Sequence, residues 1–248
     1  MIKIGLIGYG KMGKMIAQLA ESHGCQVVAI IDPKHPDQPA QINPNVLAGA
    51  DVCLEFTHPD SVMENIRQLA ALRKHIVIGT TGWNEHLDEA RNLAIRYQIG
   101  IIHGANFSIG MNLFNRLVAY ASQLADKFPD YDIWGMEMHH NQKADSPSGT
   151  AIQLAETVIA NHSRKTTAMY ETLHRRAKPE ELHFSSVRGG CVPGLHRIGF
   201  DSEADSIMLE HSVRDRSCLA AGALQAAIWI SERPGFFSFN DMMDSRLC

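Results

Sequence analysis

The segment Ile2-Lys-Ile-Gly-Leu-Ile-Gly8-Tyr-Gly-Lys-Met-Gly13 decides the fold of this chain. A strand rich in isoleucine leads into a complete G-x-G-x-x-G turn that opens a helix, and a second strand then ends at Asp32. Such glycines allow a close approach of the backbone to a pyrophosphate, and an acidic residue about 20 positions further on can hold the ribose hydroxyls. The alternative is a glycine turn that only packs a helix on a sheet. We predict a dinucleotide site formed by Gly8, Tyr9, Gly10, Lys11, Met12, Gly13 and Asp32.

The first hundred residues continue this alternation of strands and helices. We expect strands at residues 2–7, 26–31, 51–56, 75–79 and 99–103, and helices at residues 12–23, 59–73 and 85–97. Short apolar strands separated by helices predict a parallel sheet covered on both faces, and hence a Rossmann-type α/β domain. The four prolines within residues 33–44 predict a loop in place of the usual second crossover helix.

The pattern changes beyond residue 105. We expect helices at residues 111–127 and 150–161, and strands at residues 131–138, 182–187, 195–201 and 206–211. The close spacing of the last strands predicts antiparallel pairing, and so a separate α+β unit with an open, mainly antiparallel sheet. An alanine-rich helix at residues 220–230 can return to the first domain. The expected domains are a dinucleotide-binding domain at 1–105 and 217–248 and a substrate-binding domain at 106–216.

Bulk composition narrows the class of protein. The 248 residues are 45% hydrophobic and carry a net charge of −4, so charge does not favour binding to nucleic acid or an anionic membrane. No apolar run approaches the roughly 20 residues that span a bilayer, and the chain starts without a signal-peptide pattern. The cysteines form no C-x-x-C pair, which fits a reducing compartment. They are Cys25, Cys53, Cys191, Cys218 and Cys248. We predict a cytoplasmic protein that acts on a small molecule.

Two further turns follow predicted parallel strands. Gly79-Thr80-Thr81-Gly82 ends the fourth strand, and Ala105-Asn106-Phe107-Ser108 follows the fifth. Carboxyl ends of parallel strands line the ligand crevice, so we expect the first turn to lie beside a nicotinamide. A plain strand-to-helix connection with a hydroxyl cap explains that turn equally well. The second turn is a cofactor contact, a hinge, or both.

Asp32 bears on the choice between NADH and NADPH. A carboxylate at this position disfavours the 2′-phosphate of NADPH, and Pro33 stands where an arginine would favour it. Lys34 and His35 could still supply cations. The preference therefore stays open and leans toward NADH.

A second informative segment is Glu137-Met-His-His-Asn-Gln-Lys-Ala-Asp-Ser-Pro-Ser-Gly-Thr-Ala151. It places His139, His140 and Lys143 just upstream of Ser148-Gly-Thr150, a pattern typical of a helix start. Free backbone N–H groups and the positive end of the helix dipole make such a start a seat for a carboxylate or phosphate. Proton donors beside an anion seat indicate chemistry on a small acidic substrate.

Strand alternation separates the two histidines. Glu137 and His139 share one face of the predicted strand, and Met138 and His140 share the other. Because the histidines diverge and no third ligand has a useful spacing, we predict no metal site. Lys143 can hold a substrate carboxylate or donate a proton. The alternative is that both histidines merely end a strand.

Several cations outside these segments have no decided role. Arg188 and His196 flank a glycine-rich hairpin that could be a strand edge, a subunit contact or a substrate rim. Arg214 and Arg216, before the final helix, could bind an anion or be solvated.

Taken together, these motifs resemble the 4-hydroxy-tetrahydrodipicolinate reductases. The shared features, in chain order, are Gly8–Gly13, Gly79-Thr-Thr-Gly82, Ala105-Asn-Phe-Ser108, Glu137-x-His-His-x-x-Lys-x-Asp-x-Pro-Ser-Gly-Thr150, Arg188…Pro193-Gly-x-His196 and Ala221-Gly-Ala-x-x-Ala-Ala-x-Trp229. The resemblance runs almost end to end, and the segment with the two histidines, the lysine and Ser-Gly-Thr is specific to that family.

The resemblance implies reduction of 4-hydroxy-tetrahydrodipicolinate to tetrahydrodipicolinate by NADH or NADPH, in lysine and diaminopimelate biosynthesis. It also implies a homotetramer built through the sheets of the second domain, which is then the oligomerisation domain as well. The catalytic, proton-handling positions fall on His139 and Lys143. The substrate positions fall on His140, Lys143, Gly149 and Thr150, to which the helix start adds Ser148. The cofactor positions fall on the glycine turn, Asp32, Gly79, Thr80, Thr81, Ala105, Asn106 and Phe107, with Arg216 as a weaker candidate.

Three departures from the family pattern stand out, namely the proline-rich loop at residues 33–44, Pro33 itself, and Gly189-Gly190 in the hairpin. The first two leave the cofactor preference open, and none touches the catalytic segment. Two rival hypotheses for the function stand beside the resemblance. One rival is a related dehydrogenase acting on aspartate or homoserine, against which the histidine and lysine segment argues. The other is a catalytically silent NAD-sensing regulator, which would not need proton donors.

Overall fold

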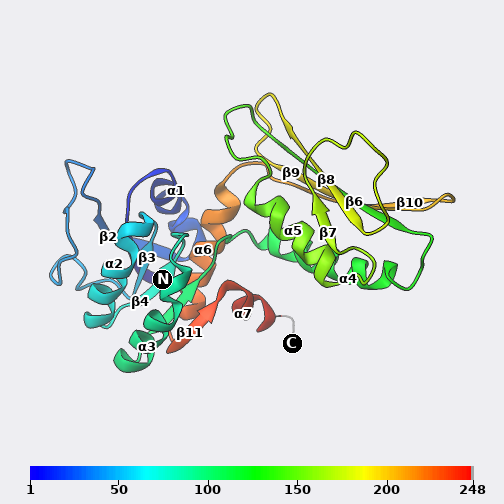
Figure 1. Ribbon diagram of the computed structural model, residues 1–248. Helices are drawn as coiled ribbons and strands as arrows, with labels where there is room; N and C mark the ends of the chain where they lie inside the picture. The colour runs from blue at the N-terminus through cyan, green and yellow to red at the C-terminus, as the bar shows by residue number, and fades with distance from the viewer. Residues whose placement is uncertain (247–248) are drawn as a thin grey trace. The chain divides into compact units, whose positions relative to one another are not determined.

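The computed structural model of the chain describes residues 1–246, which form two compact units (Figure 1). The first unit comprises residues 1–109 and the described residues from 217 onward. The second unit comprises residues 110–216. No helix among the described residues is both long enough and apolar enough to cross a membrane.

The first unit is built on a six-stranded parallel sheet with the strand order β11-β5-β4-β3-β1-β2. The strands are β1 (Ile2–Ile7), β2 (Cys25–Ile31), β3 (Val52–Glu55), β4 (His75–Ile78), β5 (Gly100–His103) and β11 (Gly235–Ser238). The five predicted strands are confirmed, with ends that differ by a residue or two. Strand β11 was not predicted, because two phenylalanines after a Pro-Gly pair are too short a signal.

Helices cover both faces of this sheet. They are α1 (Lys11–Leu19), α2 (Pro59–Ala71), α3 (Leu87–Tyr97), α6 (Ser217–Ile230) and α7 (Phe239–Asp244), with 3₁₀ turns at Glu21–His23 and Asn84–His86. The predicted helix at 12–23 is thus shorter, and Gly24 ends its 3₁₀ extension in the left-handed conformation. Residues 33–44 contain no helix or strand, as predicted.

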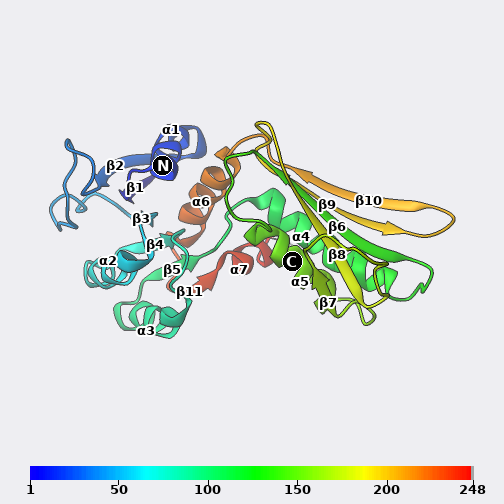
Figure 2. The ribbon, with the colours of Figure 1, turned by 45° about the horizontal axis from the view of Figure 1, so that its top comes forward.

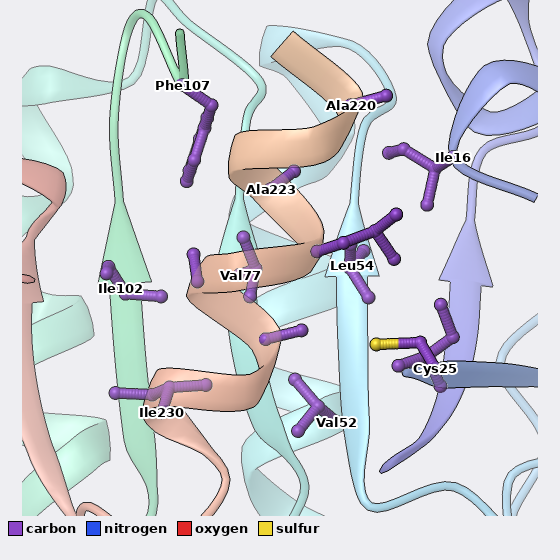
Figure 3. Packing of buried hydrophobic residues seen from close by; sticks show 14 of the residues in the cluster. Ile16, Cys25, Val52, Leu54, Val77, Ile102, Phe107, Ala220, Ala223 and Ile230 are labelled. Atoms are coloured by element: carbon purple, nitrogen blue, oxygen red, sulfur yellow. The ribbon is translucent and has the colours of Figure 1, made fainter. Parts of the chain in front are cut away.

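Strand alternation supplies a hydrophobic core on each face of the sheet. In β4, Val77 packs in the cluster beneath α6 (Figure 3), whereas Ile76 and Ile78 pack in the opposite cluster with residues of α2 and α3. All three side chains are fully buried, and each contributes roughly 1.5–3 kcal/mol to folding. The carboxyl ends of the strands are thereby held in a rigid frame.

The second unit has a five-stranded sheet with the order β10-β9-β6-β8-β7. The strands are β6 (Asp132–His139), β7 (Thr167–Met169), β8 (Glu181–Arg188), β9 (Leu195–Asp201) and β10 (Ser206–Ser212). Strand β6 pairs parallel with β8 and antiparallel with β9, while β7–β8 is parallel and β9–β10 antiparallel. The sheet is therefore mixed, and the prediction of a mainly antiparallel sheet was wrong in this detail.

The predicted hairpin between Arg188 and His196 does not form. Strand β6 lies between β8 and β9, and the connection crosses its end, where the Gly189 N–H donates to the His139 carbonyl over 2.9 Å. A short glycine-rich link normally joins neighbouring strands, which is why the sequence suggested a hairpin. Its actual course brings Arg188 and His196 to either side of the predicted site strand.

Two helices, α4 (Ile109–Ala125) and α5 (Gly149–Ala160), run along one face of this sheet (Figure 2). Their apolar residues and those of β6, β8 and β9 form a single core. The α5 helix contacts β6, β7 and β8, so its amino end is fixed near the end of β6.

Candidate active site

The glycine turn has the geometry that a dinucleotide requires. Gly8 has φ +94°, and a Cβ atom on it would overlap the Phe56 carbonyl. A Cβ atom on Gly13 would overlap the Gly8 carbonyl, whereas one on Gly10 would meet open space. Gly10 is the N-cap of α1 without a side-chain cap, so the first N–H groups of the helix are available to a pyrophosphate. The turn therefore fits the predicted cofactor.

A pocket of about 590 Å³ opens at the carboxyl ends of β1, β2 and β3. Gly8, Gly10, Asp32, Lys34 and Thr57 are among the residues that line it. The Asp32 carboxylate accepts hydrogen bonds from the backbone N–H of Tyr9 (2.6 Å) and of Lys34 (2.7 Å). These bonds fix the carboxylate at the pocket wall, where a ribose would be held.

The turn after β4 is joined to a buried carboxylate that sequence reasoning missed. Glu55, at the end of β3, is fully buried and accepts hydrogen bonds from the hydroxyls of Thr57 and Thr80 and from the Asn65 amide. Burial raises the pKa of the Glu55 carboxyl, although these hydrogen bonds oppose the rise. Thr80 is itself buried, and Thr81 beside it is exposed. The Thr80 hydroxyl is thus a structural group, and Thr81 is the hydroxyl that remains accessible.

The residues of the turn after β5 differ in burial. Phe107, labelled in Figure 3, is 2% exposed. Its ring packs edge-on against that of Phe239, with ring centroids 4.8 Å apart. The Asn106 side chain accepts a hydrogen bond from the Ser108 N–H (2.8 Å), and Ala105 is exposed. Any cofactor contact made by Phe107 would therefore use its backbone.

In the second unit, β6 alternates as predicted. Ile133, Gly135, Glu137 and His139 are buried, and the residues between them are half-buried. Glu137 is fully buried and His139 is 8% exposed, whereas His140 lies just beyond the strand and is more accessible. The two histidines therefore have different environments.

The Glu137 carboxylate accepts several hydrogen bonds at the end of β6. Its Oε1 atom accepts hydrogen bonds from the Ser148 N–H (2.9 Å), the Ser186 hydroxyl (2.8 Å) and Arg188 Nη2 (2.8 Å). Its Oε2 atom accepts from the Ser148 hydroxyl and lies 3.6 Å from His196 Nε2. Burial alone would raise the pKa of the Glu137 carboxyl, but the bonds from His196, Ser148 and Arg188 outweigh burial and hold it well below its ordinary value.

His139 lies against this carboxylate. Its Nδ1 atom is 3.1 Å from Glu137 Oε2, although the two are not aligned as a hydrogen bond, and its ring packs edge-on against His196. Burial lowers the pKa of His139 to about 4, and the Glu137 charge only partly offsets burial and the lowering by His196, Lys143 and Arg188. The imidazole is therefore neutral near pH 7 in the free protein.

Lys143 lies in the loop between β6 and α5. Its Nζ atom is paired with both carboxylate oxygens of Asp145, at 2.7 and 2.8 Å, and its backbone N–H donates to the His140 carbonyl. The ammonium is 23% exposed, so a ligand can reach it. Asp145 is a partner that the sequence analysis did not consider.

The amino end of α5 is the predicted anion seat. Ser148 is its N-cap, and its hydroxyl accepts from the Ala151 N–H. Within the described part of the chain, the N–H groups of Gly149 and Thr150 have no acceptor, and Gly149 is exposed. The expectation that Ser148 itself contacts substrate meets a difficulty, because its N–H and hydroxyl are both bonded to Glu137. Gly149 and Thr150 are the groups that can receive an anion.

Three side chains of this site come close enough to suggest a cation site. Ligand atoms of Glu137, His139 and His196 lie within 4.8 Å of one another. The Glu137 oxygens are, however, occupied by Ser148, Ser186 and Arg188, and the Arg188 guanidinium would repel a metal ion. We assign the cluster to hydrogen bonding.

The remaining predicted cations differ in placement. Arg188 belongs to the site through Glu137, while Arg214 and Arg216 are exposed and Arg216 is the last residue of the second unit. The assignment of Arg216 to the cofactor stays a prediction. Glu137 was not predicted as a site residue, although it begins the shared family motif and has the same strand parity as His139. His196 was left undecided as part of a possible substrate rim.

Comparison with known proteins identifies the family. A sequence model described as "Dihydrodipicolinate reductase, N-terminus" matches residues 2–107, and one described as "Dihydrodipicolinate reductase, C-terminus" matches residues 110–243. The chain belongs to the dihydrodipicolinate reductase family. It is therefore an oxidoreductase, and the Rossmann-type unit marks its cofactor as a nicotinamide dinucleotide.

Relatives named 4-hydroxy-tetrahydrodipicolinate reductase cover nearly the whole chain. The protein of Rickettsia canadensis (strain McKiel) is 35% identical over 98% of both chains. The protein of Archaeoglobus fulgidus is 31% identical over 95% of this chain and 96% of its own.

Solved structures agree with this family assignment. A dipicolinate-bound dihydrodipicolinate reductase from Paenisporosarcina sp. TG-14 superposes with a TM-score of 0.77 at 27% identity, covering 97% of this chain and 99% of the other. A scyllo-inositol dehydrogenase from Lactobacillus casei, solved with NAD(H), has a TM-score of 0.54 at 12% identity over 98% of this chain and 89% of its own. At that identity, the second match concerns the fold alone.

Proposed function

We propose that this chain reduces 4-hydroxy-tetrahydrodipicolinate to tetrahydrodipicolinate with a nicotinamide cofactor, in lysine and diaminopimelate biosynthesis. The observation that carries the proposal is the site at the end of β6. There, a buried histidine, an accessible lysine and two free helix N–H groups occur in a chain of this reductase family. A sensor without catalysis would not need this set of groups.

The anion seat accounts for binding of a cyclic dicarboxylate. In this proposal the N–H groups of Gly149 and Thr150 receive one carboxylate, with Lys143 and His140 as further cationic or donor groups. Dipicolinate, bound by the Paenisporosarcina relative, carries the same pair of carboxylates. A substrate with only one carboxylate would use fewer of these groups.

The reaction exchanges a ring hydroxyl for hydrogen, so it consumes one hydride and one proton and releases water. The bound nicotinamide supplies the hydride. Lys143 carries a positive charge beside the substrate seat, and His139 is neutral until an anion binds near it and favours its protonated form. We assign proton handling to these two side chains.

We propose NADH as the better cofactor. The Asp32 carboxylate is fixed at the pocket wall by two backbone N–H groups, and a 2′-phosphate there would meet its negative charge. Lys34 also lines the pocket, so NADPH should still bind. Gly8 to Gly13 would hold the pyrophosphate, and Thr81 and the backbone at residues 105–107 would lie toward the nicotinamide.

We further propose a homotetramer that uses the uncovered face of the second sheet. That face carries the β6 side chains opposite the core, Trp134, Met136 and Met138, while Val187 on β8 and Met208 on β10 are more than two-fifths exposed. Light scattering should give four times the chain mass of 27.5 kDa. We place the reaction in the cytoplasm, consistent with the absence of disulfide bonds at Cys25, Cys53 and Cys191.

The test is a steady-state assay with substrate made in situ from pyruvate and aspartate semialdehyde. We expect oxidation of both cofactors, with a higher kcat/KM for NADH. Activity on aspartate or homoserine with none on this substrate would assign the chain to the rival dehydrogenase class. Cofactor binding without turnover of any of the three would favour the sensor.

A further inference from the structure

We propose that Glu137 is a positioning residue that holds the two halves of the substrate site, the His139 ring and the loop leading to α5, in one arrangement. The inference deepens the proposed function and rests on it for the meaning of the site. Glu137 touches neither of the groups assigned to bind substrate carboxylate, Gly149 and Thr150, and acts through their neighbours. It is therefore not itself a catalytic residue.

The first link runs from Glu137 to the anion seat. Both its oxygens bind Ser148, one through the backbone N–H at 2.9 Å and the other through the hydroxyl. The same hydroxyl accepts the Ala151 N–H as the N-cap of α5. A shift of the carboxylate would therefore move the cap, and with it the free N–H groups that follow.

The second link runs from Glu137 to Lys143. Arg188 Nη2 donates to Glu137 Oε1 over 2.8 Å and to the Asp145 carbonyl over 2.6 Å. The Asp145 carboxylate in turn holds the Lys143 ammonium. These contacts together fix the loop that carries Lys143. The loop itself contains no helix or strand.

The third link is to His139, two residues along the same face of β6. Glu137 Oε2 lies 3.1 Å from the His139 Nδ1 atom, and the His196 ring packs edge-on against the His139 ring. The Glu137 carboxylate raises the pKa of this ring, whereas the neighbouring His196, Lys143 and Arg188 lower it. Its position sets both the orientation and the charge balance of the imidazole.

The chemistry of the neighbours requires a carboxylate at this position. Ser148, Ser186 and Arg188 all approach Glu137 as donors. A glutamine offers one oxygen and one NH₂ group, so at least one donor would face another donor in a buried place. An aspartate keeps the charge and both acceptors but is shorter by one methylene.

The test compares Glu137→Gln and Glu137→Asp with a matched control, Glu181→Gln. Glu181 begins the strand β8 that Arg188 ends, is 7% exposed and is paired with an arginine, Arg175, outside the site. We expect Glu137→Gln to lower kcat/KM by roughly 100-fold, as a misplacement of about 1 Å does, with a higher KM and a lower kcat. Glu137→Asp should recover much of this loss, and Glu181→Gln should match the wild type.

Hydrogen exchange on the free protein provides a readout that does not depend on turnover. In Glu137→Gln, amide exchange should become faster within residues 138–151 and stay unchanged in the remainder of the second unit. A kcat/KM within about threefold of wild type, equal losses in Glu137→Gln and Glu181→Gln, or faster exchange throughout the unit would overturn the proposal. If the wild type lacks reductase activity, the proposed function fails, whereas the exchange experiment still decides whether Glu137 holds the loop. A chelator should leave all activities unchanged, since the cluster is assigned to hydrogen bonds.

Discussion

At the scale of single residues, His139 and Lys143 have opposite starting states. The histidine is buried and neutral, and the lysine is partly exposed and paired with Asp145. A bound dicarboxylate would compete with Asp145 for the ammonium and would draw a proton to the imidazole. We therefore expect the site to reach its working charge only when the substrate is present.

Removal of the lysine is the first residue-level prediction. Lys143→Ala should lower kcat by roughly 10²–10⁴, the usual range for loss of one general acid. Lys127→Ala is the control, because Lys127 is exposed and lies outside the site. Equal turnover by Lys143→Ala and the wild type would show that proton transfer does not use this side chain.

Cofactor preference gives the second prediction. Asp32→Ser removes a negative charge from the pocket wall while keeping a hydroxyl acceptor for the Tyr9 N–H. The ratio of kcat/KM for NADPH over NADH should rise about tenfold, which corresponds to roughly 1.4 kcal/mol. Lys3→Ala, outside the pocket lining, should leave the ratio unchanged. A fall in the ratio for Asp32→Ser would mean that Asp32 does not face the ribose.

Residue types and spacing predicted the side chains assigned to substrate and proton transfer better than the buried carboxylates that hold them in place. His139, His140 and Lys143 stand in one short segment, so their proximity follows from the sequence. Glu55 and Glu137 were missed as organising groups because their partners are distant in the chain, such as Thr80 for Glu55 and Arg188 for Glu137. Those pairings depend on strand order, which a single sequence does not fix.

At the scale of elements, a glycine allows a helix to lie close to the backbone of a neighbouring segment. Gly222 in α6 faces the Phe107 carbonyl, and a Cβ atom there would overlap it. Gly222→Ala should therefore lower the free energy of unfolding by roughly 1–3 kcal/mol, as overpacking of a core does. Denaturant titration measures the change.

Gly10→Ala is the matched control for this prediction. A Cβ atom at Gly10 meets no protein atom within 4 Å but projects where the pocket lies. The substitution should leave the unfolding midpoint unchanged and weaken cofactor binding. The reverse result, an unstable Gly10→Ala and an unchanged Gly222→Ala, would contradict the roles given to both glycines.

Element prediction succeeded where hydrophobic periodicity was long and failed where topology decided. The strands and helices of the first hundred residues have clear apolar patterns, and each was found near its expected place. The Arg188–His196 link looked like a hairpin, but β6 inserts between β8 and β9. The short elements β7, β11 and α7 have too few residues for a recognisable period.

At the scale of the whole molecule, histidines govern stability in mild acid. Burial is the largest cause that lowers the pKa of each of five of them: His75, His103, His139, His162 and His211. The unfolded chain, with ordinary pKa values near 6.5, takes up protons before the folded chain does. The free energy of unfolding should therefore fall as the pH drops below about 6.5, and for His139 this loss continues to about pH 4.

Denaturant titrations at about pH 7.5, 6.5 and 5.5 test this prediction through the midpoint of unfolding. The unfolding midpoint should be lower at about pH 5.5 than at about pH 6.5. Glu55 changes the free energy of unfolding in the opposite direction, because its raised pKa favours folding as the pH falls. Its single contribution is opposed by those of the five histidines. A midpoint that is constant or rises toward pH 5.5 would contradict the burial of these imidazoles.

The central claim is hydride transfer from a nicotinamide to the ring of 4-hydroxy-tetrahydrodipicolinate, and its most direct test is a deuterium label. NADH carrying deuterium at the transferred position of the nicotinamide would be incubated with the enzyme and the substrate formed in situ. The account predicts tetrahydrodipicolinate with one deuterium on a ring carbon, and loss of this product in Lys143→Ala. Unlabelled product, or label that appears only in homoserine when aspartate semialdehyde is supplied alone, would contradict it.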